Sequence, residues 1–202
     1  MLGSGAVDDP DLVLVERWRG GEQRAGEALF ARHFADIYRF FENKARGDAD
    51  ELVQRTFLGC LRSRDQFRGQ SSFRTYLFAI ARHELYRYLR ELRRDEAVDF
   101  GVTSIAQLVT TPRARLQRVR EAERLREALR ELPVEQQLLL ELHYWHDLDI
   151  AALAEVFEAP QATVRTRLFR ARRALRQRLD QAALSGATDP MAVAISGDGE
   201  DE

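Results

Sequence analysis

The stretch PQATVRTRLFRARRALRQRL, residues 160–179, predicts a long amphipathic helix. Its apolar side chains recur at helical spacing and form one stripe, at Val164, Leu168, Ala171, Leu175 and Leu179. Thr166, Phe169 and Arg170 fall on the opposite face, and seven arginines but a single acidic residue occur between residues 161 and 180. This basic face either contacts the phosphates and base edges of a nucleic acid or is simply exposed to solvent.

The residues just before this helix favour the nucleic-acid interpretation. Asp149 is a good N-cap for a short helix over residues 150–157, and residues 158–160 predict a tight turn. Two short helices joined by about four residues, the second of them basic, are the pattern of a helix-turn-helix. Upstream, residues 113–132 predict a charged helix that Pro133 ends, and residues 135–145 predict a strongly apolar one.

The N-terminal half predicts further helices from residue 11 onward. Residues 48–61, DADELVQRTFLGCL, open with an acidic first turn that suits the helix dipole. Their apolar positions form a stripe that we expect in the core: Leu52, Val53, Phe57 and Leu61. Residues 62–72 are polar and predict a loop, in which Ser71 or Ser72 is the expected N-cap of the next helix.

That next helix, residues 73–94, has the strongest helical periodicity in the chain, and arginines cluster on its exposed side. Tyrosines interleaved with arginines are typical of surfaces that stack on single-stranded nucleic acid. For Tyr76 and Tyr88 we favour the simpler interpretation, that their rings lie half-buried at the edge of the core.

No segment shows the alternation of a β-strand, so we expect an all-α fold made of two small helical domains joined by a flexible linker. The expected division is a disordered lead-in over residues 1–10, a first domain over 11–94, a linker over 95–112 with a short helical turn near 105–109, a helix-turn-helix domain over 113–180 and a disordered acidic tail over 181–202.

Composition indicates a soluble protein that we expect in the cytoplasm. The first ten residues carry no positive charge, no apolar run approaches a membrane span, and the one cysteine excludes an internal disulfide. The net charge of −2 conceals an uneven distribution, because residues 181–202 contain five acids and no base. The remainder is therefore basic, as a nucleic-acid partner requires.

We find no pattern that predicts catalysis. His143 and His146 have a spacing that can bind zinc, but no further cysteine or histidine lies near them in the sequence. The acidic residues around Asp50 are neighbours on one helix, so their side chains do not converge on a single point. We therefore expect no enzymatic activity, no cofactor and no metal site.

Three stretches, in this order, resemble the extracytoplasmic-function (ECF) sigma factors, a group within the bacterial sigma-70 superfamily. Residues 48–61 are similar to the family's helix that binds the clamp helices of the polymerase β′ subunit. Residues 71–94, SSFRTYLFAIARHELYRYLRELRR, resemble the helix that melts and reads the promoter −10 element. Residues 132–179 resemble the domain that reads the −35 element.

The resemblance implies three sets of site residues. The polymerase-binding set is Asp50, Glu51, Gln54 and Phe57. The −10 set, in which residues 65–72 capture an unstacked base, is Gln66, Phe67, Arg68, Ser71, Ser72, Arg82, His83 and Arg87. The −35 set is Thr163, Arg165, Thr166, Arg167, Phe169, Arg170 and Arg173.

The resemblance also implies the partners: core RNA polymerase through the β′ clamp helices and the β flap, promoter DNA, and an anti-sigma factor that holds the protein inactive. The chain departs from the family pattern at His83, where asparagine is common, and at Glu158 and Ala162, where glycine is common. These departures make the promoter sequence unpredictable. An alternative function is a helix-turn-helix transcriptional regulator that binds DNA without polymerase, but it leaves residues 48–94 unexplained.

Overall fold

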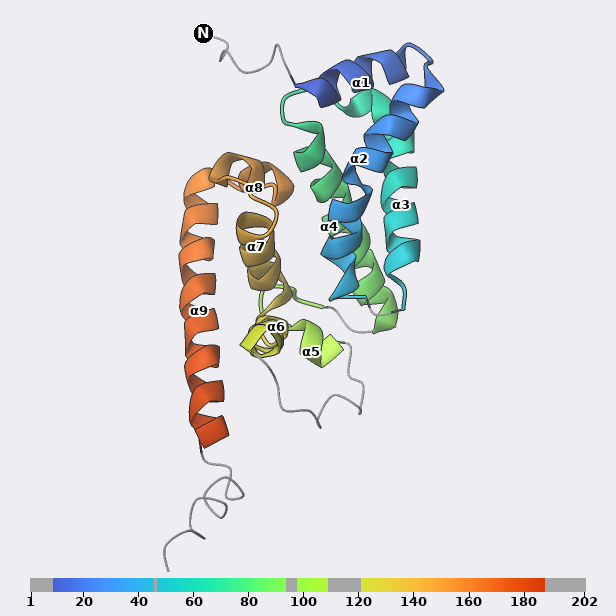
Figure 1. Ribbon diagram of the computed structural model, residues 1–202. Coiled ribbons are helices and arrows are strands. Elements are labelled where there is room, and N and C mark those ends of the chain that lie inside the picture. The colour runs from blue at the N-terminus through green and yellow to red at the C-terminus, as the bar shows by residue number, and fades with distance from the viewer. Residues whose placement is uncertain (1–8, 46, 94–97, 109–120, 188–202) are drawn as a thin grey trace, which may run out of the picture. The chain divides into compact units, whose positions relative to one another are not determined.

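The computed structural model describes residues 9–45, 47–93, 98–108 and 121–187, and the regular elements among these residues are all helices (Figure 1). The all-α prediction is therefore confirmed. The helices are α1 (Pro10–Arg19), α2 (Gln23–Glu42), α3 (Ala49–Arg62), the 3₁₀ helix η1 (Arg64–Gln66), α4 (Phe73–Leu92), α5 (Ile105–Leu108), α6 (Glu121–Arg130), α7 (Val134–Tyr144), α8 (Ile150–Val156) and α9 (Gln161–Ala187). Within the described ranges, no helix is both long and apolar enough to cross a membrane.

The described residues form two compact units. The first contains the N-terminal helices α1–α4 together with Glu141–Arg165, and the second contains residues 98–140 together with α9 from Thr166 onward. This grouping differs from the division expected from the sequence, since the segment that carries α8 groups with the N-terminal helices. Parts of the predicted segments lie outside the described residues: 1–8 of the lead-in over 1–10, 95–97 and 109–112 of the linker over 95–112, 113–120 at the start of the next helix, and 188–202 of the tail over 181–202.

The core of the first unit is rich in aromatic side chains. The rings of Phe40 and Phe41 on α2 meet edge to face with centroids 5.0 Å apart, and Phe40 lies 5.8 Å from Phe78 on α4. Helices α3 and α4 approach closely at Gly59, where an added Cβ would lie 3.1 Å from the Ile80 side chain. The apolar stripe of α4 is buried in this core through Phe73, Leu77, Ala81, Leu85 and Leu89. Burial of this stripe fixes which face of α4 remains available for other contacts.

One charged cluster is buried in the same unit. Lys44, the only lysine of the chain, forms an ion pair with Glu141 and donates a hydrogen bond to the carbonyl oxygen of Phe40. The ring of His146 packs on Phe78 with centroids 4.7 Å apart, and burial, followed by the charge of Lys44, lowers the pKa of His146 to about 4. Paired in this way, the buried ammonium group is compatible with an apolar core.

Two helix starts lie where the sequence predicts them. The Ser72 side chain accepts a hydrogen bond of 3.1 Å from the backbone N–H of Thr75 at the start of α4. The Asp149 side chain accepts one of 2.8 Å from the backbone N–H of Ala152 at the start of α8. Both capping predictions are confirmed, and the short helix expected near residues 105–109 is present as α5.

Three details differ from the sequence-based expectation. Leu61, expected in the core stripe of α3, is 45% exposed, and Leu92 at the end of α4 is also exposed. Helix α9 continues to Ala187, seven residues beyond the predicted end of the domain at Asp180. The residues past Asp180 include several alanines, which have the highest helix propensity and allow the helix to continue.

The second unit is built around the start of α7. The backbone N–H groups of Val134 and Glu135 donate hydrogen bonds of 2.9 and 3.0 Å to the carbonyl oxygens of Thr103 and Phe100. Ion pairs connect the same region to α9: the guanidinium of Arg167 pairs with Glu135, and that of Arg178 lies 3.4 Å from Glu131. The apolar stripe predicted for α9 is confirmed for Val164, Leu168 and Ala171, which are buried, whereas Leu175 and Leu179 are half-buried.

The turn between α8 and α9 contains a strained residue. Glu158 has φ of 51°, in the left-handed region where a β-carbon clashes with the neighbouring backbone. Glycine adopts this conformation without the clash, and it is the residue most often found just past the end of a helix. Glu158, one of the departures noted in the sequence, thus has a left-handed backbone that favours glycine.

We expect the Glu158→Gly variant to be more stable to unfolding than Glu158→Ala by about 1 kcal/mol, because both lose the carboxylate but only glycine relieves the strain. Urea denaturation followed by circular dichroism measures the difference. Ala159→Gly is the control: residue 159 has no positive φ, so glycine should lower stability there. Equal stability of the two Glu158 variants would contradict a left-handed residue 158.

Candidate protein-binding and nucleic-acid-binding surfaces

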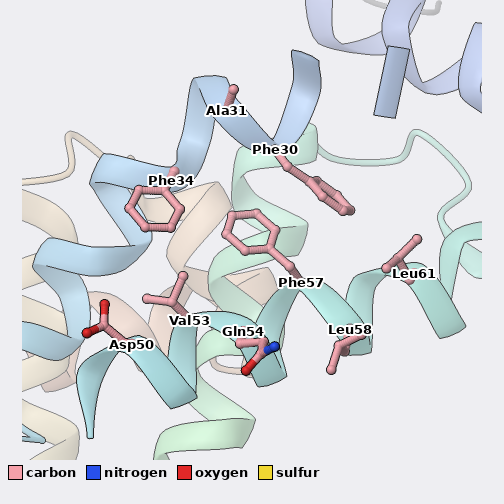
Figure 2. Close-up of a pocket in the computed structure, with 9 residues that line it drawn as sticks. All are labelled: Phe30, Ala31, Phe34, Asp50, Val53, Gln54, Phe57, Leu58 and Leu61. Carbon is pink, nitrogen blue, oxygen red and sulfur yellow. The ribbon is translucent and has the colours of Figure 1, made fainter. Parts of the chain in front are cut away.

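An apolar groove of about 650 Å³ lies between α2 and α3 (Figure 2). Three aromatic rings form its floor: Phe57 of α3 lies 4.7 Å from Phe30 and 6.4 Å from Phe34, both on α2. Figure 2 shows these rings turned toward one another, with Asp50 and Gln54 along the α3 side. The lining residues are Phe30, Ala31, Phe34, Asp50, Val53, Gln54, Phe57, Leu58 and Leu61.

Several large apolar side chains in the groove are exposed to solvent. Phe34 is 48% exposed, Leu58 42% and Leu61 45%. A contiguous apolar surface with a few polar groups at its edge is typical of a site that binds another protein. The geometry therefore supports a protein partner that inserts apolar side chains between α2 and α3.

Three of the four residues expected to bind polymerase line this groove, namely Asp50, Gln54 and Phe57. The fourth, Glu51, is exposed outside it and accepts a hydrogen bond of 2.9 Å from Nε of Arg55. Sequence reasoning missed the contribution of α2 and of Leu58. The spacing of four between Phe30 and Phe34, with a third aromatic at Tyr38, was the available signal for an aromatic face on α2.

The loop before α4 carries the first part of the −10 set. Gln66, Arg68 and Ser72 are exposed, whereas Phe67 is buried, with its ring 5.8 Å from that of Phe73 and 5.0 Å from that of Tyr76. Phe67 therefore anchors the loop to the body of the unit. Gly69, with φ of 67°, provides the turn that lets the following residues return to the start of α4.

The two tyrosines interpreted as core-edge residues are partly or fully buried, which confirms that interpretation. Burial raises the pKa of Tyr76, and its hydroxyl donates a hydrogen bond of 3.0 Å to the carbonyl oxygen of Ser63. Burial, followed by the hydrogen bond to Asp48, raises the pKa of Tyr88 to about 12. Both hydroxyl groups stay protonated near neutral pH and act as donors that connect α4 to α3.

The three α4 residues of the −10 set already have partners within the first unit. Arg82 donates a hydrogen bond of 3.1 Å to the carbonyl oxygen of Val156, and His83 lies 2.8 Å from Glu158. Arg87 forms an ion pair with Glu84. A contact between two exposed side chains, such as that of His83 with Glu158, contributes only about 0–1 kcal/mol, so a phosphate can replace the carboxylate there at small cost.

The −35 set lies on one helix, α9, but its members differ in exposure. Arg165, Thr166, Phe169, Arg170 and Arg173 are exposed, and Phe169 is 65% exposed. Thr163 is half-buried, and Arg167 is held by its ion pair with Glu135. An exposed phenylalanine among arginines has no packing role in the described residues, and it can contact a thymine methyl group in a major groove.

Two parts of the chain match known protein families. Residues 29–95 match the family described as Sigma-70 region 2, and residues 122–175 match the family described as Sigma-70, region 4. The first match contains the groove, the loop and α4, and the second contains α9 up to residue 175.

The chain aligns with curated relatives over nearly the whole length of those relatives. The ECF RNA polymerase sigma-E factor of Haemophilus influenzae is 26% identical over 179 residues, which cover 84% of this chain and 95% of the relative. The protein of the same name in Escherichia coli K12 is 28% identical over 179 residues, 82% of this chain and 92% of the relative.

Solved structures share the fold. CnrH in complex with the cytosolic domain of CnrY superposes with a TM-score of 0.62 and 27% identity, covering 86% of this chain and 99% of that one. The sigma factor RpoE in complex with the anti-sigma factor NepR from Bartonella quintana superposes with a TM-score of 0.56 and 19% identity, covering 76% and 96%. The second likeness concerns the fold alone.

Proposed function

Because the chain belongs to the sigma-70 superfamily and is an ECF sigma factor for transcription initiation, we propose that it binds core RNA polymerase through the α2–α3 groove and promoter DNA through α4 and α9. The observation that carries the proposal is the exposed aromatic groove inside the region 2 match. A regulator that acts without polymerase is not favoured, since it gives no role to this region.

The groove is suited to a helical partner. Its apolar floor runs along two neighbouring helices, which is the arrangement that receives the apolar face of an amphipathic helix. Asp50 and Gln54 at its side provide an acceptor and an amide that select a partner with complementary polar groups. The family resemblance names that partner as the β′ clamp helices, and it names the β flap as a second contact of the C-terminal region.

Recognition of the −10 element is assigned to the loop at residues 65–72 and to α4. The loop presents Gln66, Arg68 and Ser71 beside the N-terminus of α4, where a flipped base would be received. Unstacking a base costs a few kcal/mol, and contacts of Arg82, His83 and Arg87 with the strand would offset this cost. These contacts require the three side chains to exchange their present partners for DNA.

Recognition of the −35 element is assigned to the exposed face of α9. Arginine pairs with guanine edges, threonine and phenylalanine contact the thymine methyl group, and the remaining arginines neutralise phosphates. We assign Arg165 and Arg170 to base edges, and Arg173 to the backbone. Two modest DNA-binding surfaces on one chain bind far more tightly together than either does alone.

Regulation by an anti-sigma factor is part of the same proposal. RpoE of Bartonella quintana was solved with its anti-sigma factor, and CnrH with the cytosolic domain of CnrY. We propose that this chain also has an anti-sigma partner, and that it works in the cytoplasm, where RNA polymerase and the chromosome are found.

The decisive experiment is transcription in vitro with purified core polymerase from the source organism and a library of its genomic promoters. We expect the full chain to direct initiation from a specific subset of promoters that core polymerase alone does not use. Lack of initiation at every promoter, under conditions in which a housekeeping sigma factor is active with the same core enzyme, would refute the proposed function.

Substitution of the exposed groove residues tests the polymerase contact. We expect Phe34→Ser combined with Leu58→Ser to weaken the affinity for core polymerase on the order of 10- to 100-fold, because two apolar contacts are lost from the interface. Fluorescence anisotropy of the labelled chain titrated with core enzyme measures the Kd. The control is Val13→Ser combined with Leu92→Ser, which alters equally exposed apolar residues elsewhere. Equal weakening in both double variants would contradict the assignment of the groove.

Two arginines of α9 test the division between base and phosphate contacts. We expect Arg170→Ala to relax the preference at one position of the −35 element by about 1–3 kcal/mol. Arg173→Ala should instead weaken binding evenly across sequences and lower the salt dependence by about one counterion. Competition binding on a library of −35 duplexes at several salt concentrations measures both effects. Identical profiles for the two variants would show that the division is wrong.

A further inference from the structure

A residue of α1, outside the three predicted sets, fixes the loop that precedes α4. Nη2 of Arg19, the last residue of α1, donates hydrogen bonds to the carbonyl oxygens of Arg64, at 3.1 Å, and of Phe67. These two carbonyl groups lie at the beginning of η1 and immediately after its end. A single guanidinium nitrogen therefore connects the two ends of this turn, across 45 and 48 residues of sequence.

The Arg19 side chain is itself held in place. Its Nη1 lies 3.2 Å from Oε1 of Glu16 one turn earlier on α1, and its guanidinium lies 5.9 Å from the centroid of the Phe67 ring. Three quarters of the side chain is covered, because it is only 25% exposed. Arginine with its donors fixed in a planar fork loses little freedom when it forms such bonds.

The neighbouring residue Trp18 contributes a second attachment. The guanidinium of Arg64 lies 5.3 Å from the centroid of the Trp18 ring. Trp18 cannot shift easily, because it packs against Gly26 so closely that an added Cβ there would lie 2.6 Å from the indole nitrogen. The last turn of α1 is thus a rigid support for the beginning of the loop.

The other end of the loop is fixed independently. Ser72 caps α4, and its hydroxyl lies 2.8 Å from that of Thr75. Between the two anchors, residues 68–70 are exposed. The loop therefore has a short accessible span whose end points are both set by packed elements, as a preorganised binding site requires.

We propose that Arg19 is a positioning residue for −10 recognition: it does not contact DNA, but it holds residues 65–72 in the conformation that receives the unstacked base. This inference rests on the proposed function, since the loop has a base to receive only in a sigma factor. Without the Arg19 bonds, the carbonyl groups of Arg64 and Phe67 lose their donor and the span between the anchors samples many conformations. Capture of a base must then offset the conformational entropy that residues 65–72 lose when they become ordered, and this lowers the affinity for the strand.

The test uses holoenzyme assembled from core polymerase and the full chain. We expect Arg19→Ala to weaken binding of a single-stranded non-template −10 oligonucleotide about 10-fold and to reduce the fluorescence change of a 2-aminopurine placed at the captured position. Binding of core polymerase and of a −35 duplex should stay unchanged, and so should the melting temperature within a few degrees. Those three measurements would change together if Arg19 had only a structural role.

Two substitutions at the same residue sharpen the test. Arg19→Lys keeps a donor that can reach the carbonyl groups and should recover part of the oligonucleotide affinity, whereas Arg19→Met keeps only the apolar stem and should not. Arg17→Ala is the matched control, since Arg17 is on the same helix and pairs with Glu22 at 2.6 Å on the surface. It should behave as wild type.

Wild-type affinity of Arg19→Ala for the −10 oligonucleotide would overturn the proposal, and so would equal losses of core polymerase, −35 and −10 binding in Arg19→Ala and Arg19→Met. Failure of the wild-type holoenzyme to retain the −10 oligonucleotide would refute the proposed function itself, and the role of Arg19 with it.

Discussion

The burial of the apolar stripe of α4 is the constraint on which the first unit depends. Because Phe73, Leu77, Ala81, Leu85 and Leu89 pack against the neighbouring helices, the rotation of α4 about its own axis is fixed. The direction of every polar side chain on the helix follows from that rotation. His83 and Arg87 are exposed because the apolar stripe occupies the opposite face of the helix, whereas Arg82 is largely covered and bonds to the carbonyl oxygen of Val156. The capped start of α4 sets where the preceding loop ends.

The same principle explains which features could be predicted. The stripe of α9 is a strict 3.6-residue repeat, so Val164, Leu168 and Ala171 were predictable from spacing alone. The caps at Ser72 and Asp149 were predictable because each precedes an apolar helical repeat. A hydroxyl or carboxylate there accepts a hydrogen bond from a backbone N–H of the first turn, which has no partner within the helix. These features depend only on residues within one turn of each other.

The features that could not be predicted depend on distant partners. Leu61 and Phe34 have the spacing of core residues and yet are exposed, because periodicity does not distinguish a face that the chain buries itself from a face that another molecule buries. The contact of Arg19 with the loop joins residues more than 40 positions apart, and no local pattern marks it. Glu51, which the family resemblance places in the polymerase-binding set, does not line the groove, since successive residues of a helix point about 100° apart.

The groove between α2 and α3 has a consequence for the chain in isolation. Its exposed phenylalanine and leucine side chains can pack against a second copy of the chain as well as against a different protein. The reason is that the hydrophobic effect is non-directional and selects little between apolar surfaces. Contacts between two copies through this surface become more frequent as the concentration of the chain rises. An exposed apolar groove of this kind favours self-association of the purified protein, and a partner that covers it removes that tendency.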